Sequence, residues 1–187
     1  MEWAKDTTYD PWQLSHPIKD KGVPKAVEHW RRPRQGWIKC NVDASFFAEE
    51  GRGEPGAVLR DHEGRPCGGR ARWSDHCRNA MATEALACRD GVQFAIDRGV
   101  QRLILETDCQ VLVNLWKHPS CHNAEVGPLL QQIDDPSQCF VDFSLVFSSR
   151  TCNKLAHECA KLVSRDRSVE EWLVPPLGLW GIVRKRL

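Results

Sequence analysis

The sequence predicts an α/β domain in which helices pack on a mixed β-sheet. Three observations lead to this prediction. Three strand-like segments follow one another closely, with a short turn between the second and the third. Helix-like and strand-like segments then alternate. The chain has 187 residues without internal repeats, which suits one domain with extensions.

The first strand-like segment has apolar side chains at every second position from Ile38 to Phe46 and mostly polar ones between them. Two more such segments follow, and the turn "DHEG" separates them. Short connections of this kind join antiparallel neighbours, so we predict an antiparallel meander. Its strands span residues 37–47, 56–61 and 66–73.

After residue 73 the chain alternates between segments with the helical period of 3.6 residues and segments with the strand pattern. A long helix-like segment stops at Gly99, a common position for a C-terminal cap. The stretch "RLILE" after it is almost wholly apolar, which is typical of a strand covered on both faces. We predict helices at 80–98, 109–117, 126–133 and 152–165, and strands at 102–106 and 139–147.

The two ends of the chain are assigned to no helix or strand of the domain. Residues 1–34 contain four prolines among mixed charges, and we predict an N-terminal arm or linker there. The tryptophans of this arm, Trp3, Trp12 and Trp30, could dock on the domain. We place the domain at residues 35–170 and a C-terminal tail at 171–187.

Composition narrows the function classes. The net charge is +1, from 26 basic and 25 acidic residues, so bulk charge favours neither nucleic acid nor a membrane surface. No apolar run is long enough to span a membrane, and the first residues lack the apolar centre of a signal peptide.

The nine cysteines are an odd number and include no C-x-x-C pair. The nearest approach to zinc-ligand spacing is His118, Cys121 and His122, beside proline and serine. We therefore expect no zinc and interpret the cysteines as small thiols in a reducing compartment. The protein is expected to be intracellular, cytoplasmic or nuclear, and not secreted.

Three carboxylates stand in unusual positions. Asp43 interrupts a strand, where aspartate is rare. Glu84 lies beside the apolar stripe of its helix, with no charged partner three or four positions away. Asp108 follows the strand 102–106, and ligands gather at the carboxyl ends of such strands. Taken singly, Glu84 suits a first helical turn and Asp108 a helix N-cap.

If these three side chains converge, they need a cation. Two like charges 4 Å apart repel by roughly 4 kcal/mol at an effective dielectric constant near 20. A shared site would therefore require a divalent ion or raised pKa values. Oxygen ligands select hard ions, which favours Mg²⁺ or Mn²⁺.

The sequence resembles the ribonuclease H family, and more closely its plant reverse-transcriptase-like group related to retrotransposon domains. The matching segments are "KCNVDASF", "ATEALACRDGVQFAIDRGV", "LILETDCQVLVNLW" and "RTCNKLAHECAK". The resemblance implies a ribonuclease H-like fold over about residues 35–170. Its mixed five-stranded sheet would have three antiparallel strands and then two parallel ones, with helices on both faces.

The resemblance also implies a site and a reaction. Asp43, Glu84 and Asp108 fall on the family's metal-binding carboxylates, and His157 in "NKLAH" stands where the family has a fourth carboxylate. Histidine can bind a metal or relay a proton, but it suits Mg²⁺ less well. The reaction would be hydrolysis of the RNA strand of an RNA–DNA hybrid, with two Mg²⁺ or Mn²⁺ ions.

Two residues depart from the family pattern close to this site. Ala44 stands where glycine is common, and Cys109 replaces a common serine. The densest basic stretch, residues 60–78, has five arginines against three acidic residues, a net charge of +2. We expect nucleic-acid contacts from Ser45, Arg70, Arg72, Arg78, Cys109 and Asn153.

One alternative belongs to another functional class. The domain could be a retrotransposon-derived remnant that binds nucleic acid or a protein partner without cutting. His157 and Ala44 favour this interpretation, and the three carboxylates oppose it. A nucleotide-cofactor enzyme is disfavoured because there is no G-x-G-x-x-G segment and no P-loop. The sequence does not fix the oligomeric state, and we expect a monomer.

Overall fold

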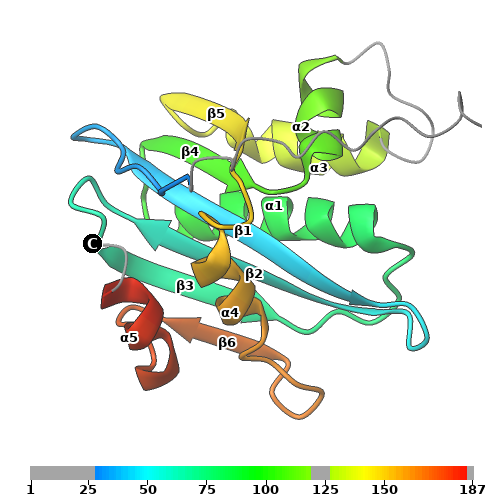
Figure 1. The fold of residues 1–187 in the computed structure, drawn as a ribbon. Coiled ribbons are helices and arrows are strands. Elements are labelled where there is room, and N and C mark those ends of the chain that lie inside the picture. Colours follow the sequence, from blue (N-terminus) through cyan, green and yellow to red (C-terminus); the bar gives the residue numbers. More distant parts are fainter. Residues whose placement is uncertain (1–27, 119–126, 185–187) are drawn as a thin grey trace, which may run out of the picture.

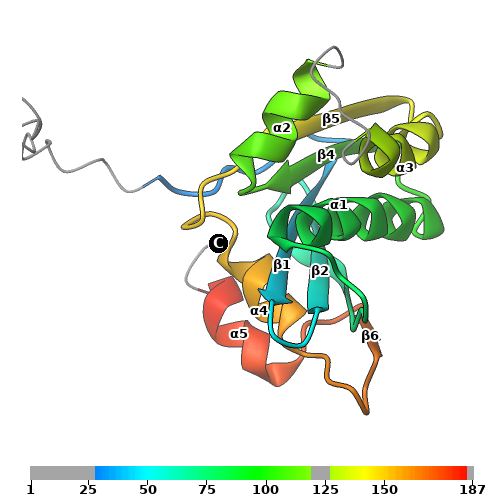
Figure 2. The same cartoon turned by 90° about the vertical axis from the view of Figure 1, so that its right-hand side faces the viewer.

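The computed structural model describes residues 28–118 and 127–184, which form a six-stranded sheet with helices on both faces (Figures 1 and 2). The strands are β1 (Ile38–Phe47), β2 (Arg52–Arg60), β3 (Pro66–Arg72), β4 (Arg102–Thr107), β5 (Asp142–Phe147) and β6 (Val169–Trp172). The helices are α1 (Ala80–Asp97), α2 (Gln110–Lys117), α3 (Gly127–Ser137), α4 (Lys154–Ala160) and α5 (Leu177–Arg184).

The sheet is mixed, as the sequence predicts. Its order is β5-β4-β1-β2-β3-β6, so β1 lies inside the sheet. The first three strands are antiparallel, and β4 and β5 continue the sheet in parallel with β1. The expected five strands were one too few, because β6 pairs antiparallel with β3 at the edge. This strand has only four residues, too few to display an alternation.

Several element boundaries differ from the sequence prediction. Helix α3 ends at Ser137 instead of residue 133, and β5 begins at Asp142 instead of residue 139. Strand β2 begins at Arg52 instead of residue 56 and includes Pro55. The β2–β3 ladder begins only at Gly56, so proline occupies a part of β2 that lies outside that ladder. Helix α4 has only seven residues, fewer than predicted.

Each face of the sheet has its own hydrophobic core. Figure 2 shows the helices that cover the two faces. Helices α1, α2 and α3 share one core with β1, β4 and β5. Helices α4 and α5 form a smaller core with β2, β3 and β6 on the opposite face. The stretch expected to be a C-terminal tail thus contributes the end of β6 and the whole of α5.

The last residues of the predicted arm lie against the domain. The Trp30 indole N–H donates to Glu106 Oε2 at 2.8 Å, and the Arg60 guanidinium lies 3.5 Å from the centre of the Trp30 ring. Glu106 also accepts from Lys39 and Asn41. A buried polar network therefore joins the segment before β1 to three strands of the sheet.

Four residues singled out from the sequence cannot be placed in the fold. Trp3, Trp12, Cys121 and His122 lie outside the described residues. None of the helices in the described part of the chain has both the length and the apolar character needed to cross a membrane.

Candidate metal centre

Asp43 lies on β1, and the close packing of α4 on the sheet brings His157 to it. Asp43 pairs across the ladder with Gly56 of β2. A Cβ atom at Gly56 would lie 2.6 Å from the backbone nitrogen of Ala160, so only glycine lets α4 approach this closely. His157 lies one turn before Ala160, and its Nδ1 is 2.6 Å from Oδ2 of Asp43.

Glu84 reaches the site from the N-terminal part of α1. That helix begins at Asn79, whose side chain accepts a hydrogen bond from the Ala82 backbone at 2.8 Å. Further along, a Cβ atom at Gly91 would lie 2.6 Å from Val42, so α1 rests directly on β1. This contact keeps Glu84 close to the strand that carries Asp43.

Asp108 follows β4, where the sequence places a strand end. Strands β4 and β1 are parallel neighbours, with Thr107 opposite Val42. Asp108 directly follows Thr107 and Asp43 directly follows Val42, so the two aspartates lie at the same level of the sheet. The chain then turns into α2, and the Cys109 N–H donates to the Thr107 hydroxyl at 3.1 Å.

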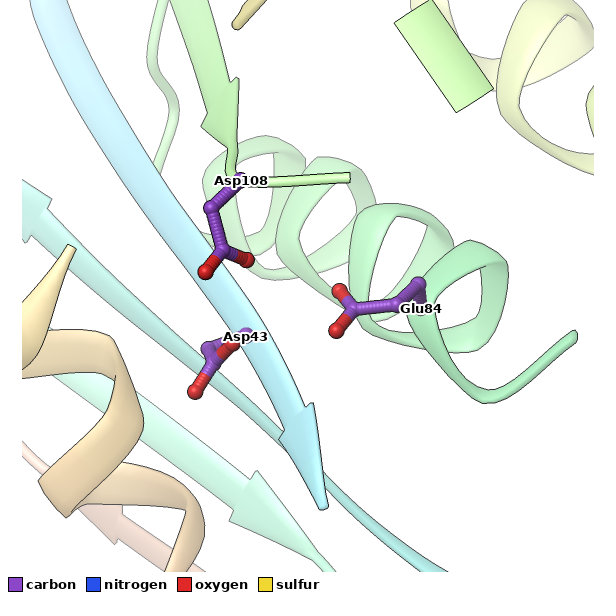
Figure 3. A group of neighbouring side chains, drawn as sticks. All are labelled: Asp43, Glu84 and Asp108. Atoms are coloured by element: carbon purple, nitrogen blue, oxygen red, sulfur yellow. The ribbon is translucent and has the colours of Figure 1, made fainter. Parts of the chain in front are cut away.

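The three carboxylates converge as the sequence predicts. Asp43, Glu84 and Asp108 each offer an oxygen, and these three atoms lie within 4.8 Å of one another (Figure 3). Among the described residues, this is the group of three or more potential ligands found close enough to hold one metal ion. His157 is not part of it.

Each carboxylate has a different partner. Asp43 contacts His157, and Asp108 accepts from Nε of Arg150 at 3.2 Å. Glu84 Oε2 is buried and has no hydrogen-bond partner among the described residues. The sequence did not single out Arg150, because nothing in a loop pattern predicts a contact with a residue 42 positions earlier.

Burial and mutual repulsion raise the pKa values of two of these groups. Burial and then the charge of Asp108 raise the pKa of Asp43 from 3.8 to about 6, opposed by the hydrogen bond with His157. Burial, Asp43 and Asp108 raise the pKa of Glu84 from 4.5 to about 8, although the Ala44 backbone and Arg150 lower it. The cluster thus holds more negative charge than its surroundings neutralise.

This donor set fits a hard divalent cation. All three ligand atoms are carboxylate oxygens, which Mg²⁺ and Mn²⁺ prefer. A buried carboxylate oxygen without a partner costs free energy, and a bound cation would remove that cost at Glu84 Oε2.

His157 contacts Asp43 through Nδ1. An ionised carboxylate can only accept, so the imidazole donates from Nδ1 once Asp43 is ionised. The histidine side chain remains 47% exposed. In this arrangement His157 orients Asp43 directly, while its second nitrogen, Nε2, is left for other contacts.

Two expected nucleic-acid contacts, Arg70 and Arg72, are held in ion pairs with acidic side chains. Arg70 forms ion pairs with Asp97 and Glu171, and Arg72 pairs with Asp90. Asp97 is at the far end of α1, roughly 20 Å along the helix axis from Glu84. The structure therefore gives both arginines a role in joining β3 to α1.

The other four expected contacts are Asn153, Ser45, Cys109 and Arg78. Asn153 is buried and donates to the Val42 carbonyl at 2.7 Å, so it holds the start of α4 against β1. Ser45 and Cys109 are partly exposed, two positions and one position after a cluster carboxylate. Arg78 is exposed at the start of α1 and lines a pocket of about 390 Å³.

The raised pKa values predict that the metal-free protein loses stability as pH rises. Between the ordinary and the raised pKa values, the folded protein keeps protons that the unfolded chain has released. The resulting stability is complete below the ordinary values of 3.8 and 4.5 and is lost as pH rises through about 6 and about 8. Glu84→Gln should gain melting temperature relative to the parent across that range.

The measurement is thermal unfolding in a chelator from about pH 5 to about pH 9. Saturating Mg²⁺ should reduce the pH dependence of the parent, because a bound cation keeps both carboxylates ionised. Identical pH profiles for the parent and Glu84→Gln in chelator would contradict this account of the cluster.

Residues 41–163, about two thirds of the chain, match the family described as reverse transcriptase-like. The chain belongs to the reverse transcriptase-like family. A curated Arabidopsis thaliana protein named "Putative ribonuclease H protein" is 35% identical over 88 residues, which cover 47% of this chain. The match covers only 14% of that protein's length.

Solved structures identify the fold of this reverse transcriptase-like domain as ribonuclease H-like. The N-terminal RNase H domain of a Mycobacterium tuberculosis protein superposes with a TM-score of 0.61 and 14% identity, covering 67% of this chain and 91% of that one. RNase H1 of Halobacterium salinarum gives 0.61 and 16%, covering 66% and 93%. LC11-RNase H1, solved with an RNA/DNA hybrid, gives 0.59 and 14%, covering 65% and 92%.

Proposed function

We propose that this domain is a divalent-metal-dependent nuclease that hydrolyses the RNA strand of RNA–DNA hybrids. The observation that carries the proposal is the convergence of Asp43, Glu84 and Asp108, with a buried Glu84 oxygen that has no partner among the described residues. Such a cluster is costly when empty and becomes favourable when it binds cations. The ribonuclease H-like fold is consistent with this chemistry.

Each residue has a role in the proposal. Asp43, Glu84 and Asp108 would hold the ions. Bound Mg²⁺ or Mn²⁺ would supply Lewis-acid stabilisation of the phosphate and a more acidic water. His157 fixes the orientation of Asp43, and its exposed ring can move a proton at the edge of the site.

The substrate is proposed by analogy. One solved neighbour with this fold, LC11-RNase H1, was crystallised with an RNA/DNA hybrid. Telling RNA from DNA requires contacts with the 2′-hydroxyl. Ser45 and Cys109 are proposed to contact substrate because both are partly exposed beside the carboxylates, and Arg78 because it is exposed at the start of α1.

A second candidate function is nucleic-acid binding without cleavage. The observation in its favour is that the place of the fourth carboxylate is taken by His157, which is hydrogen bonded to Asp43. Such a domain would still bind hybrid but would not turn it over.

A cleavage assay separates the two functions. The protein is incubated with a labelled RNA–DNA hybrid, and separately with DNA duplex, in Mg²⁺, Mn²⁺ or chelator. We expect metal-dependent cleavage of the RNA strand only. Hybrid binding without cleavage in either metal would leave the second function, and absence of both would reject the nucleic-acid assignment.

His157 provides a sharper prediction about metal preference. In this proposal Nε2 of His157 also reaches a bound ion, and Mn²⁺ accepts nitrogen ligands more readily than Mg²⁺ does, so the parent is expected to be more active in Mn²⁺. His157→Asp restores an oxygen ligand and should improve the Mg²⁺/Mn²⁺ activity ratio by about tenfold, the lower range for changes beside a metal ligand.

His157→Asn is the matched control, since it has the shape of aspartate without the charge. Its Mg²⁺/Mn²⁺ activity ratio should lie between those of the parent and His157→Asp, because an amide oxygen binds Mg²⁺ more weakly than a carboxylate does. If all three proteins share one metal preference, His157 does not take part in the reaction.

A further inference from the structure

A row of three polar side chains, Lys39, Asn41 and Asp43, runs along one face of β1. Cys40 and Val42, which alternate with them, belong to the core that α1 shares with the sheet. The polar row therefore lies on the opposite face, which α4 covers. Asp43 is a member of the carboxylate cluster, but Lys39 and Asn41 are not. Asn41 is nonetheless fully buried, and the Lys39 side chain is only 13% exposed.

Glu106 lies at the centre of the network that buries these two residues. It accepts hydrogen bonds from the Trp30 indole N–H at 2.8 Å, from the Asn41 amide at 2.8 Å and from Lys39 Nζ. The Trp30 ring also lies over Arg60, whose Nη2 donates to Asn41 Oδ1 at 2.6 Å. Trp30 thus contacts both charged partners of Asn41, one anion and one cation.

The Asn41 amide carries this arrangement to Asn153. Its nitrogen donates to Glu106 and also to Asn153 Oδ1, at 3.2 Å, while its oxygen accepts from Arg60. A flipped amide would direct its N–H groups at the Arg60 cation, so these charged partners fix which way the amide faces. Freedom of movement for Glu106 and Arg60 would therefore loosen the contact between Asn41 and Asn153.

Asn153 joins the network to the site at two points. Its side-chain amide donates to the Val42 carbonyl at 2.7 Å, directly before Asp43. Its backbone carbonyl accepts from the His157 N–H at 3.2 Å, in the first turn of α4. His157 in turn lies against Asp43. A shift of Asn153 would therefore move both a cluster carboxylate and its histidine partner.

We propose that Trp30 is a positioning residue for the metal site. Its indole holds Glu106 and Arg60 in place, and these two side chains hold the Asn41 amide. That amide in turn holds Asn153, and with it the first turn of α4. The inference rests on the proposed function, because an effect on the reaction requires the reaction.

A rival explanation is that Trp30 only stabilises the fold. Its loss would then speed hydrogen exchange in α1 as much as in α4, and kcat would stay at the parent value wherever the variant is folded. A positioning role predicts a local change instead, with exchange that is fastest in the first turn of α4 and a lower kcat.

The first measurement is backbone hydrogen exchange of the full chain in chelator, which requires no activity. For Trp30→Ala we expect exchange at residues 154–160 to be about tenfold faster than in the parent, the scale of a lost hydrogen bond to a charged group. The change in α1 should be clearly smaller. Trp30→Phe keeps a ring over Arg60 but lacks the indole N–H, so its effect should lie between those of the parent and Trp30→Ala.

The second measurement is cleavage of an RNA–DNA hybrid, at a temperature where melting curves show every variant to be folded. Trp30→Ala should lower kcat by about tenfold, as partners behind metal ligands do, with KM close to that of the parent. Asn153→Ala should lower kcat similarly. The double variant should lose little more, because both changes break one connection. Trp30→Phe replaces Trp30→Ala in each comparison if the latter does not fold.

Trp73→Ala is the matched control. The Trp73 indole N–H also donates to a carboxylate, that of Asp75, at 3.0 Å, and the Arg52 guanidinium also lies over its ring, 4.5 Å from the centre. Arg52 is paired with Glu50 and Glu54 and not with the network around Glu106. Both kcat and the exchange of α4 should remain those of the parent.

The outcomes are distinguishable. If the parent cleaves hybrid and folded Trp30→Ala keeps the parent kcat, the positioning role is rejected while the proposed nuclease stands. Equal acceleration of exchange in α1 and α4, or an equal loss of kcat in Trp73→Ala, would also reject it in favour of general destabilisation. Fully additive losses in the double variant would reject the route through Asn153. If the parent cleaves no hybrid in Mg²⁺ or Mn²⁺, the proposed function and this inference fail together.

Discussion

Asp43→Asn is expected to abolish cleavage and the response of the protein to Mg²⁺ together. Asp43 is the carboxylate that raises the pKa of Glu84 most strongly after burial, so the substitution should stabilise the metal-free protein at neutral pH. It should also remove one of the three carboxylates that would hold the metal. Metal ions contribute several kcal/mol to such reactions, so a loss of about a thousandfold or more in rate is expected.

Two measurements check this prediction. Hybrid cleavage gives the loss of rate, and thermal unfolding in Mg²⁺ and in chelator gives the metal response, which follows mass action in the parent. Asp142→Asn is a matched control, because Asp142 is an exposed aspartate on β5 that is also paired with a charged partner, Arg102. An equal Mg²⁺ shift in the parent and Asp43→Asn would place the ion elsewhere.

Gly56→Ala is expected to damage stability and the site at once. The added methyl group would lie 2.6 to 2.9 Å from backbone and Cβ atoms of Ala160, and backbone atoms cannot turn aside. Helix α4 must therefore move away from the sheet and take His157 away from Asp43. Overpacking of this kind costs about 1 to 3 kcal/mol of unfolding free energy.

Denaturant unfolding measures the stability, and the metal preference described for His157 reports the site. The matched control is Gly181→Ala in α5, where a Cβ atom would meet nothing within 4 Å. In a helix that change should be neutral or stabilising by up to about 1 kcal/mol. A Gly56→Ala protein as stable as the parent would show that α4 is not held by this contact.

Much of the fold and the centre of the site could be predicted from the sequence because they follow from local patterns. Alternation along β1 made Asp43 conspicuous, and the apolar "RLILE" segment placed Asp108 at a strand end. Glu84 was recognisable because its helix offers it no partner. Each of these signals depends only on neighbours within a few positions.

The features that the sequence did not predict depend on contacts between residues far apart in the chain. Glycines 56 and 91 look like ordinary glycines until the helices that they admit are placed on the sheet. The hydrogen bond between Arg150 and Asp108 joins two loops, which have no period to predict it. Strand β6 exists because β3 offers it an edge, and its own four residues do not specify it.

Trp30, which precedes β1, shows that the folded domain begins before the segment that matches the family. The family match starts at residue 41, inside β1, but Trp30 is hydrogen bonded to Glu106 and stacked on Arg60. A fragment cut at the start of the match would uncover a carboxylate and a guanidinium that are now only 5% and 3% exposed. The unit defined by shared sequence is thus smaller than the unit that folds, and a fragment meant for biochemistry should begin upstream of Trp30.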